Sequence, residues 1–297
     1  MWLLGNPTLR LFVGAALISL SPVWVKLVSV SPTTSGFYRV LIGSMALAVY
    51  LLVKRQRLRL PNRAWLILLG ASVFFALDLW FWHRSINYIG PGLSTLLANF
   101  QVFIMMFAGI VLLRQLPSLT QVFAVPLALT GLALIVGLDW RNLPQDYRVG
   151  VIFGLLTAVA YAGYLLSLRE ARRDSEHMMP IREVAIVSVI CAVILAVSAV
   201  AEGESLAISN FPDAVFLVAY GILSQGLGVI FIASSLRQVS TTEAGIALLL
   251  QPTLSFIWDV LFFARPMTAT ELLGAAIALI AIYLGSRPSS KQAQGAR

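Results

Sequence analysis

Charged side chains are scarce in this chain of 297 residues. Asp, Glu, Lys and Arg make up 11% of the sequence and hydrophobic residues 59%, whereas about a quarter of a typical soluble domain is charged. So few charges cannot cover a water-exposed surface. The shortage therefore indicates a chain that lies in a lipid bilayer.

The residues that build catalytic and metal sites are also few. Cys191 is the only cysteine, which excludes an intramolecular disulfide and a cysteine-based metal site. His83 and His177 are the only histidines and form no HExxH motif, so neither zinc nor haem is expected. The three lysines match no P-loop (G-x-x-x-x-G-K-S/T), and no G-x-S-x-G elbow occurs. The sequence predicts no enzyme, no ATP-driven pump, no metal and no cofactor.

Long apolar stretches are abundant instead, and short polar breaks separate them. A helix needs roughly 20 apolar residues to cross the hydrocarbon core. We expect ten spans, at about 8–29, 33–53, 64–83, 91–113, 118–138, 149–168, 182–201, 213–235, 244–263 and 269–286. The predicted fold is an all-α polytopic membrane protein, and its loops leave no room for a soluble domain.

The basic residues indicate how these spans are oriented. With a cytoplasmic N-terminus, fifteen fall at inside loops or span ends: Arg10, Lys54, Arg55, Arg57, Arg59, Arg63, Arg114, Arg169, Arg172, Arg173, Arg182, Arg237, Arg287, Lys291 and Arg297. The outside loops hold four: Arg84, Arg141, Arg148 and Arg265. Cytoplasmic loops carry the excess of Lys and Arg. We therefore expect both termini in the cytoplasm, and the net charge of +8 reflects topology and not nucleic-acid binding.

The ten spans divide into two sets of five. A shift of 150 positions lays 85–134 over 235–284, pairs Gln101 with Gln251, and superimposes the polar break 114–118 on 264–268. An odd number of spans makes the second set enter from the opposite side, as in the inverted repeats of secondary transporters. We expect a first repeat at 1–140, an external linker at 141–148, a second repeat at 149–286 and a cytoplasmic basic tail at 287–297.

Polar residues inside the spans are the candidate site, because such groups are costly in lipid and usually face a cavity or a partner. Asp78 and Trp82 are four residues apart on one helical face, and His83 follows. Asp78 could hold a substrate amino group or a proton, or could pair with Arg39 or Lys26. Trp82 could form a cavity wall or belong to the interfacial aromatic belt.

Further polar positions occur in four other spans. Asn99 and Gln101 lie in the fourth span, while Gln251, Ser255 and Asp259 form an i, i+4, i+8 stripe in the ninth. Those glutamines could line a midplane cavity or form an interhelical hydrogen bond. Further candidates are Tyr161, Tyr164 and Gln225, with Tyr161 the better placed tyrosine.

Charged residues near the span ends have competing interpretations. Lys26 and Arg39 near outer span ends could extend to the interface, or Arg39 could receive a carboxylate. Glu243 and Glu271 at span starts are expected to cap helix N-termini.

Two five-span halves, short loops and small residues within the spans resemble the drug/metabolite transporter superfamily, in its EamA-type branch. The most specific part is 234–285, with a weaker copy from Ser85. The proline of the second-half motif is Pro252, whereas Val102 stands at that place in the first half. Gln115 and Arg265 replace a glutamate that commonly precedes the end of this motif, so no role of that acid is carried over.

Within this branch the chain looks most like the YddG-type amino-acid exporters. That resemblance implies a cavity lined by the third, fourth and sixth spans, with Asn99, Gln101 and Tyr161 at the matching positions. Because the first two are polar, the resemblance implies broader selectivity than that of a purely aromatic site.

We therefore expect an inner-membrane secondary transporter. It would export amino acids, aromatic ones included, or related small metabolites by alternating access, with substrate and lipid as its partners. Asp78, His83 and Asp259 are the candidate proton carriers, and Lys26 and Arg39 are further charge sites. The alternatives are an exporter of drugs, sugars or nucleotide-like metabolites, and a membrane scaffold or sensor without transport.

Overall fold

The computed structural model describes residues 6–56, 60–114, 116–137, 140–172, 180–236 and 238–286. Within these ranges every regular element is a helix, and ten helical stretches are long and apolar enough to cross a membrane. The predicted all-α, ten-span fold is confirmed. The predicted tail 287–297 and the residues Gln115 and His177 lie outside the described residues.

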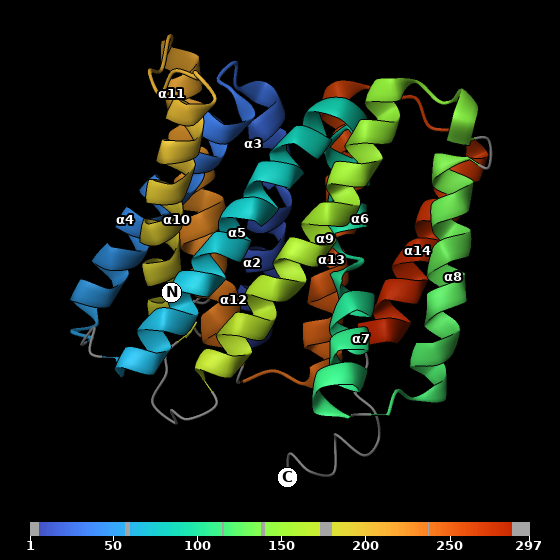
Figure 1. Ribbon diagram of the computed structural model, residues 1–297, viewed down its shortest axis with the longest axis horizontal. Coiled ribbons are helices and arrows are strands. Elements are labelled where there is room, and N and C mark those ends of the chain that lie inside the picture. Colours follow the sequence, from blue (N-terminus) through green and yellow to red (C-terminus); the bar gives the residue numbers. More distant parts are fainter. Residues whose placement is uncertain are drawn as a thin grey trace.

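Three of the ten spans are built from more than one helix (Figure 1). The elements are α2 (Pro7–Ser19) with α3 (Ser21–Leu27), α4 (Pro32–Val53), α5 (Asn62–Ile89), α6 (Pro91–Ala98) with α7 (Gln101–Leu113), α8 (Leu119–Val136), the 3-10 helix η1 (Trp140–Asn142), α9 (Gln145–Ala171), α10 (Pro180–Ala201), α11 (Phe211–Ala219) with the π-helix η2 (Tyr220–Gly228) and α12 (Val229–Ser235), α13 (Thr241–Phe263) and α14 (Ala269–Ser286).

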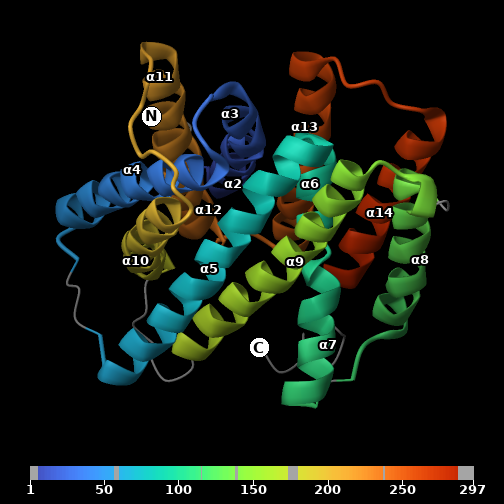
Figure 2. The same ribbon diagram turned by 45° about the horizontal axis from the view of Figure 1, so that its top comes forward.

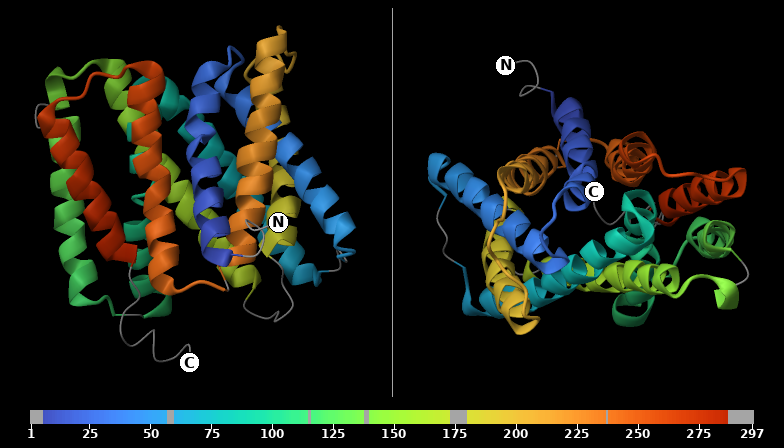
Figure 3. Two further views of the ribbon diagram at one scale, coloured as in Figure 1. Left: turned by 180° about the vertical axis from the view of Figure 1, so that it is seen from behind. Right: turned by 90° about the horizontal axis from the view of Figure 1, so that it is seen from above.

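The spans alternate between two faces of the bundle. We call the face where α2 begins and α14 ends the lower face, and the face that carries the α3–α4 and α10–α11 connections the upper face (Figures 1 and 3). The first span therefore rises from the lower face and the sixth, α9, descends from the upper one. This arrangement is compatible with an inverted repeat of five spans.

Side chains with hydrogen-bonding oxygens begin several of the helices. Ser118 and Gln121 form a capping box at α8, and Ser240 and Glu243 form one at α13. Thr268 and Glu271, one shift of 150 positions after Ser118 and Gln121, also exchange hydrogen bonds, at 2.8 and 3.1 Å. The capping roles predicted for Glu243 and Glu271 are confirmed.

Glycines allow two pairs of helices to pack backbone against backbone. A Cβ atom on Gly131 of α8 would lie 2.8 Å from the Gly274 carbonyl oxygen of α14, and one on Gly274 would lie 2.8 Å from the Gly131 oxygen. A Cβ on Gly43 of α4 would lie 3.3 Å from the Gly221 carbonyl oxygen of η2, and one on Gly221 would lie 3.1 Å from the Gly43 nitrogen. Small residues permit such close contact in membrane bundles. The second contact brings the π-helix against α4.

Hydrogen bonds at the upper face tie three spans together. Glu202, which follows α10, accepts hydrogen bonds from Arg84 at 2.7 Å, Thr33 at 2.8 Å and Trp80 at 2.5 Å. The Arg84 guanidinium also lies 3.7 Å above the Trp80 ring. The ends of α4, α5 and α10 are thereby held together on this side.

Glu202→Gln is expected to destabilise the protein at neutral pH and to reduce the further loss of stability as the pH falls. Burial works to raise the pKa of the Glu202 carboxyl, but hydrogen bonds from Trp80 and Thr33 and the Arg84 charge hold that pKa below its usual value. A lowered pKa gives stability that is present above the unfolded pKa, about 4.3, and is lost as pH falls through the folded value. We expect the unfolding temperature in detergent to fall by about 2–4 °C at pH 7.

The matched control for this prediction is Glu170→Gln at the lower face. Glu170 pairs with Arg63 at 2.6 Å, but both side chains are exposed, and exposed pairs contribute little. Equal unfolding temperatures for wild type and Glu202→Gln at pH 7 would contradict the proposed contribution of the upper cluster.

Candidate functional site

A cavity of about 880 Å³ lies inside the bundle. Its lining extends from Trp82 and Thr95, in the upper part of the bundle, to Arg169 and Pro180 at the lower ends of α9 and α10. Thr33, Trp80, Arg84 and Glu202, which close the upper face, do not contribute to it. The cavity therefore opens toward the lower face and is closed above.

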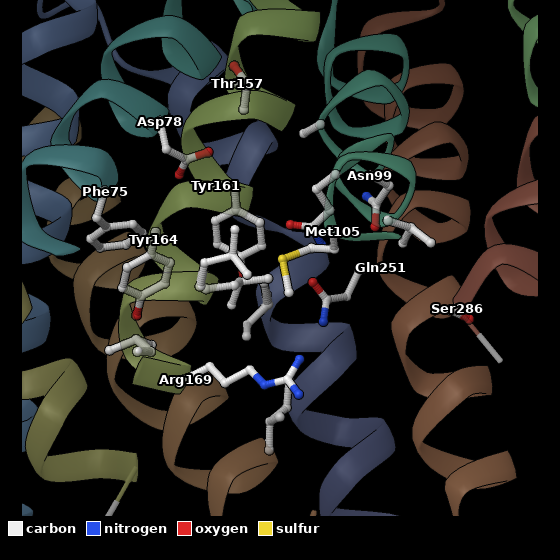
Figure 4. A pocket seen from close by; sticks show the side chains of 18 of the residues that line it. Phe75, Asp78, Asn99, Met105, Thr157, Tyr161, Tyr164, Arg169, Gln251 and Ser286 are labelled. Carbon is white, nitrogen blue, oxygen red and sulfur yellow. The ribbon is translucent and has the colours of Figure 1, made fainter. Parts of the chain in front are cut away.

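The structure brings most of the predicted substrate residues together in this cavity. Those that line it are Asp78, Trp82, Asn99, Gln101, Tyr161, Tyr164, Gln225 and Gln251, together with the predicted charge site Arg39. They come from spans that are far apart in the sequence. Asp78 and Thr157 lie at one end of the view and Arg169 at the other, with Tyr161 and Tyr164 across from Asn99 and Gln251 (Figure 4).

Helices α5 and α9 form one wall of the cavity. They run side by side through the bundle (Figure 2), and Gly163 of α9 sits against the Phe74 ring. On the cavity side, the Phe75 and Tyr164 rings stack at 4.7 Å, and Tyr161 follows at 5.6 Å from Tyr164. This wall is aromatic, and Asp78 is the carboxylate next to it.

Arg39 of α4 points into the protein and not toward the interface. Its Nε donates to Gln225 Oε1 and its Nη1 to the Tyr220 hydroxyl, both at 3.1 Å. The guanidinium carbon also lies 5.5 Å from the Trp82 ring centre and 5.2 Å from that of Tyr220. All these partners are neutral, and no carboxylate of the described residues lies within ion-pair distance of the guanidinium, so a positive charge faces the cavity.

The π-helix η2 explains why Tyr220 and Gln225 both reach Arg39. In an α-helix of 3.6 residues per turn, side chains five residues apart point in directions that differ by more than a third of a turn. A π-helix closes i→i+5 hydrogen bonds and brings such residues over one another; these helices are frequent at functional sites. Here the change of helix type aligns the two side chains on the guanidinium.

The polar network continues on both sides of Arg39. The His83 Nδ1 atom lies 2.6 Å from the Leu79 carbonyl oxygen, which can only accept, so Nδ1 carries the hydrogen. The Tyr220 hydroxyl then donates to His83 Nε2 at 3.2 Å. On the other side, Gln225 Nε2 donates to the Ser188 hydroxyl at 3.0 Å. Arg39 is thus held by a chain of side chains from α5, η2 and α10.

Asp78 contributes an acidic side chain to the same cavity. Its side chain lines the cavity and the residue is 7% exposed. Among the described residues no donor lies within hydrogen-bond or ion-pair distance of its carboxylate, so the predicted alternative of a pair with Arg39 or Lys26 is not what the structure shows. An intramembrane acidic side chain that no described residue binds by a hydrogen bond or an ion pair indicates a functional position.

Three other predicted residues lie outside the cavity lining. His83 is completely buried and contacts the Leu79 carbonyl and the Tyr220 hydroxyl. It lies inside α5, which continues to Ile89 and does not end near residue 83. Asp259 is held by Arg265 at 3.3 Å and by the Gly92 amide at 3.0 Å. Lys26 is exposed at the end of α3, as expected of a side chain that extends to the interface.

The first and fourth spans break beside the cavity. The first changes direction at Leu20, between α2 and α3, and the fourth at Asn99 and Phe100, between α6 and α7. Neighbouring hydroxyls satisfy backbone carbonyls near the first break, since Ser255 donates to Ser19 O at 3.1 Å and Ser224 to Leu17 O at 3.0 Å. Discontinuous helices in transporters commonly form substrate sites.

Several residues at this site were not predicted. Tyr220 was missed because its contact with Arg39 depends on a π-helix that no sequence period indicates. Ser21 could have been found from Pro22, which marks a bend in the first span. The sequence identifies Arg169 only as one of the basic residues that indicate topology, although its side chain lies at the cavity mouth (Figure 4).

Comparison with protein families gives a match over most of the chain. The model of the EamA-like transporter family matches residues 8–137 and, a second time, residues 148–287. Each matched segment contains five of the ten spans.

Individual proteins show the same similarity. The uncharacterized inner membrane transporter YhbE of Escherichia coli (strain K12) is 28% identical over 260 residues, which cover 82% of this chain and 78% of YhbE. An uncharacterized transporter of Haemophilus influenzae is 27% identical over 136 residues, or 44% of each chain. A solved crystal structure superimposes with a TM-score of 0.67 at 17% identity, covering 94% of this chain and 98% of the other, and supports the fold.

Proposed function

We propose that this chain, which belongs to the EamA-like transporter family, is an inner-membrane secondary transporter that exports amino acids by alternating access. The similarity to an inner membrane transporter supports the location. Among the described residues, a charged and polar cavity surrounded by membrane spans supports a carrier over a scaffold or a sensor.

The distribution of basic residues supports a cytoplasmic lower face. Arginines and lysines gather at its span ends, namely Arg10, Lys54, Arg55, Arg63, Arg114, Arg169, Arg172 and Arg182. The upper ends and loops carry Lys26, Arg84, Arg141, Arg148 and Arg265. By the positive-inside rule the cavity then faces the cytoplasm, as a carrier must when it loads a substrate for export.

One observation carries the choice of substrate. The same cavity presents Asp78, which forms no hydrogen bond or ion pair with any described residue, and the Arg39 guanidinium, whose described hydrogen-bond partners are neutral. An amino acid carries both complementary charges, because its ammonium group can bind Asp78 while its carboxylate binds Arg39. Guanidinium–carboxylate hydrogen bonds are charge-assisted and among the strongest in proteins.

The alternative substrates fit this charge pattern less well. A phosphorylated metabolite would be repelled by Asp78 and would need several cations close together. Arg169 lies at the mouth, eight residues along α9 from Tyr161 and therefore roughly 12 Å away along the helix axis. Arg172 is already paired with Glu183. A sugar would leave both Asp78 and Arg39 without a charged partner.

Substrate counterflow in proteoliposomes tests this proposal. Vesicles that contain the purified protein and an excess of an unlabelled amino acid are expected to accumulate the same labelled amino acid transiently, whereas protein-free vesicles are not. A panel of labelled amino acids, a hexose and a nucleotide sugar separates the substrate classes. Exchange of the sugars but of no amino acid contradicts the proposal, and exchange of nothing favours a scaffold.

A further inference from the structure

An ion pair at the upper face connects the two halves of the bundle. Arg265 lies between α13 and α14, and its Nη1 atom is 3.3 Å from Asp259 Oδ2 and donates to the Ile89 carbonyl oxygen at 3.1 Å. Ile89 ends α5 in the first matched segment, whereas Asp259 and Arg265 belong to the second. Both charged side chains are largely buried, with 15% of Arg265 and 3% of Asp259 exposed. The guanidinium thus binds a carboxylate of its own half and the backbone of the other half.

Asp259 makes a second contact between the halves. Its Oδ2 atom accepts a hydrogen bond from the Gly92 amide at 3.0 Å, in the first turn of α6. A carboxylate is stabilised at such a position, because the first amides of a helix have no partner within the helix. Gly90 has a φ of +86°, and a Cβ atom there would lie 2.9 Å from Asp259 Oδ2. Glycine therefore allows the turn between α5 and α6 to approach this carboxylate.

These contacts lie directly above the closed end of the cavity. Helices α6 and α13 lie side by side (Figure 2). Thr95, one turn below Gly92, and Ser255, one turn below Asp259, both line the cavity, whereas Asp259 and Arg265 do not. The ion pair therefore occupies the level of the two helices where the cavity ends and the upper face is closed.

Opening of the upper face would break only a part of this arrangement. The Arg265–Asp259 pair lies within the second half, and Glu271 of the same half is 3.8 Å from Arg265 Nη2. The pair can therefore stay intact while α6 separates from α13. The hydrogen bonds to Ile89 and Gly92 cross between the halves and must break. Water that enters the opened face can bind the freed groups, which keeps the net free-energy cost of opening modest and the step reversible.

We infer that Arg265 and Asp259 form the outer gate of the transporter. They hold the turn between α5 and α6 against α13 while the cavity is open below, and they release this turn when the substrate leaves through the upper face. This inference rests on the alternating access of the proposed function. Both are positioning residues, since neither lines the cavity. Arg265 stands where the motif described above commonly has a glutamate, which would repel Asp259, so the gate is a feature of this chain.

A single thiol below the gate reports whether the upper face is open. Thr95→Cys places that thiol in the cavity lining, where the native hydroxyl donates to the Pro91 carbonyl of its own helix at 2.8 Å. Cys191, the one native cysteine, is completely buried and should not react. A membrane-impermeant maleimide reaches the reporter thiol through the upper face in intact cells and through the lower face in inside-out membrane vesicles.

Arg265→Gln in the Thr95→Cys background is expected to raise the labelling rate in cells about tenfold. Loss of a hydrogen bond to a charged group on the closed side shifts the equilibrium toward the open upper face by about that factor. Asp259→Asn is expected to act in the same direction. The two substitutions together should raise the rate no more than the stronger one alone, because the residues act in one contact. Labelling in inside-out vesicles should not rise in any of these variants.

Arg141→Gln is the matched control, since it removes an exposed cation of the upper face outside this contact. Its labelling rates should equal those of Thr95→Cys alone. An unchanged rate in cells for Arg265→Gln overturns the gate. Faster labelling from both faces together with reaction of Cys191 also overturns it, because that result marks a loss of stability alone. Neither result contradicts the proposed function, which amino-acid counterflow by the wild type decides separately, because the labelling needs no substrate.

Discussion

Arg39→Gln is expected to lower amino-acid flux in proteoliposomes by about 100-fold, because the carboxylate of the substrate loses the one cation that the described residues place in the upper part of the cavity. A hydrogen bond to a charged group contributes about 1.5–3 kcal/mol, and the variant loses more than one. Arg39→Lys is expected to fail as well, because an ammonium group cannot contact Gln225, Tyr220 and a carboxylate with a planar fork of donors.

Two controls separate substrate binding from folding. Lys26→Gln removes an exposed cation of the same membrane half and should keep wild-type flux. An amino-acid amide, which lacks the carboxylate, should be transported equally poorly by the wild type and by Arg39→Gln, since it has no group for Arg39 to bind. Wild-type amino-acid flux in Arg39→Gln contradicts the assigned role.

Asp78→Asn is expected to have an effect of similar size, about 100-fold in flux. The substitution keeps the shape of the side chain and removes its charge, so the ammonium group of the substrate has no counter-ion in the cavity. Because no described residue hydrogen-bonds the Asp78 carboxylate, the fold should tolerate the change, with an unfolding temperature at or above that of the wild type.

Asp146→Asn is the matched control for Asp78→Asn. Asp146 lies exposed in the first turn of α9, away from the cavity. Its substitution should change neither flux nor stability. If Asp78→Asn transports amino acids as fast as Asp146→Asn does, the carboxylate is not a substrate contact.

The number and order of spans could be predicted from hydropathy, because each stretch has to satisfy its backbone inside lipid and only a helix does so. The free-energy cost of a polar group in lipid also predicts that four polar side chains face the interior of the bundle: Asp78, Asn99, Gln101 and Gln251. A polar side chain that faces lipid is expensive, so a polar stripe on an apolar helix predicts a cavity or a partner. The polar stripe identifies which face of a helix points inward, but it does not identify the residues that this face contacts.

Contacts that depend on tertiary packing or on a change of helix type could not be predicted. Arg39 lies near a span end, where extension to the interface is the default expectation, yet Tyr220 and Gln225 hold it inside. Those two residues fall on different faces of an α-helix and share one only in a π-helix. His83 was placed near the membrane boundary because α5 was expected to end six residues too early.

The sequence also could not predict that Asp78 forms no ion pair with any described residue, since an ion pair with Arg39 was an equally reasonable expectation. The structure favours neutral partners for Arg39 and leaves the carboxylate open to the cavity. The charge pattern on which the proposed substrate depends is therefore a property of the packed bundle.

Calorimetric titration of the purified protein with a matched series of ligands examines that charge pattern directly. The series consists of a transported amino acid, its amide without the carboxylate, and its deaminated acid without the ammonium group. We predict measurable binding of the amino acid and at least tenfold weaker binding of each analogue, the amide because of Arg39 and the deaminated acid because of Asp78. Equal affinity for all three ligands would show that the two opposite charges in the cavity do not recognise the substrate.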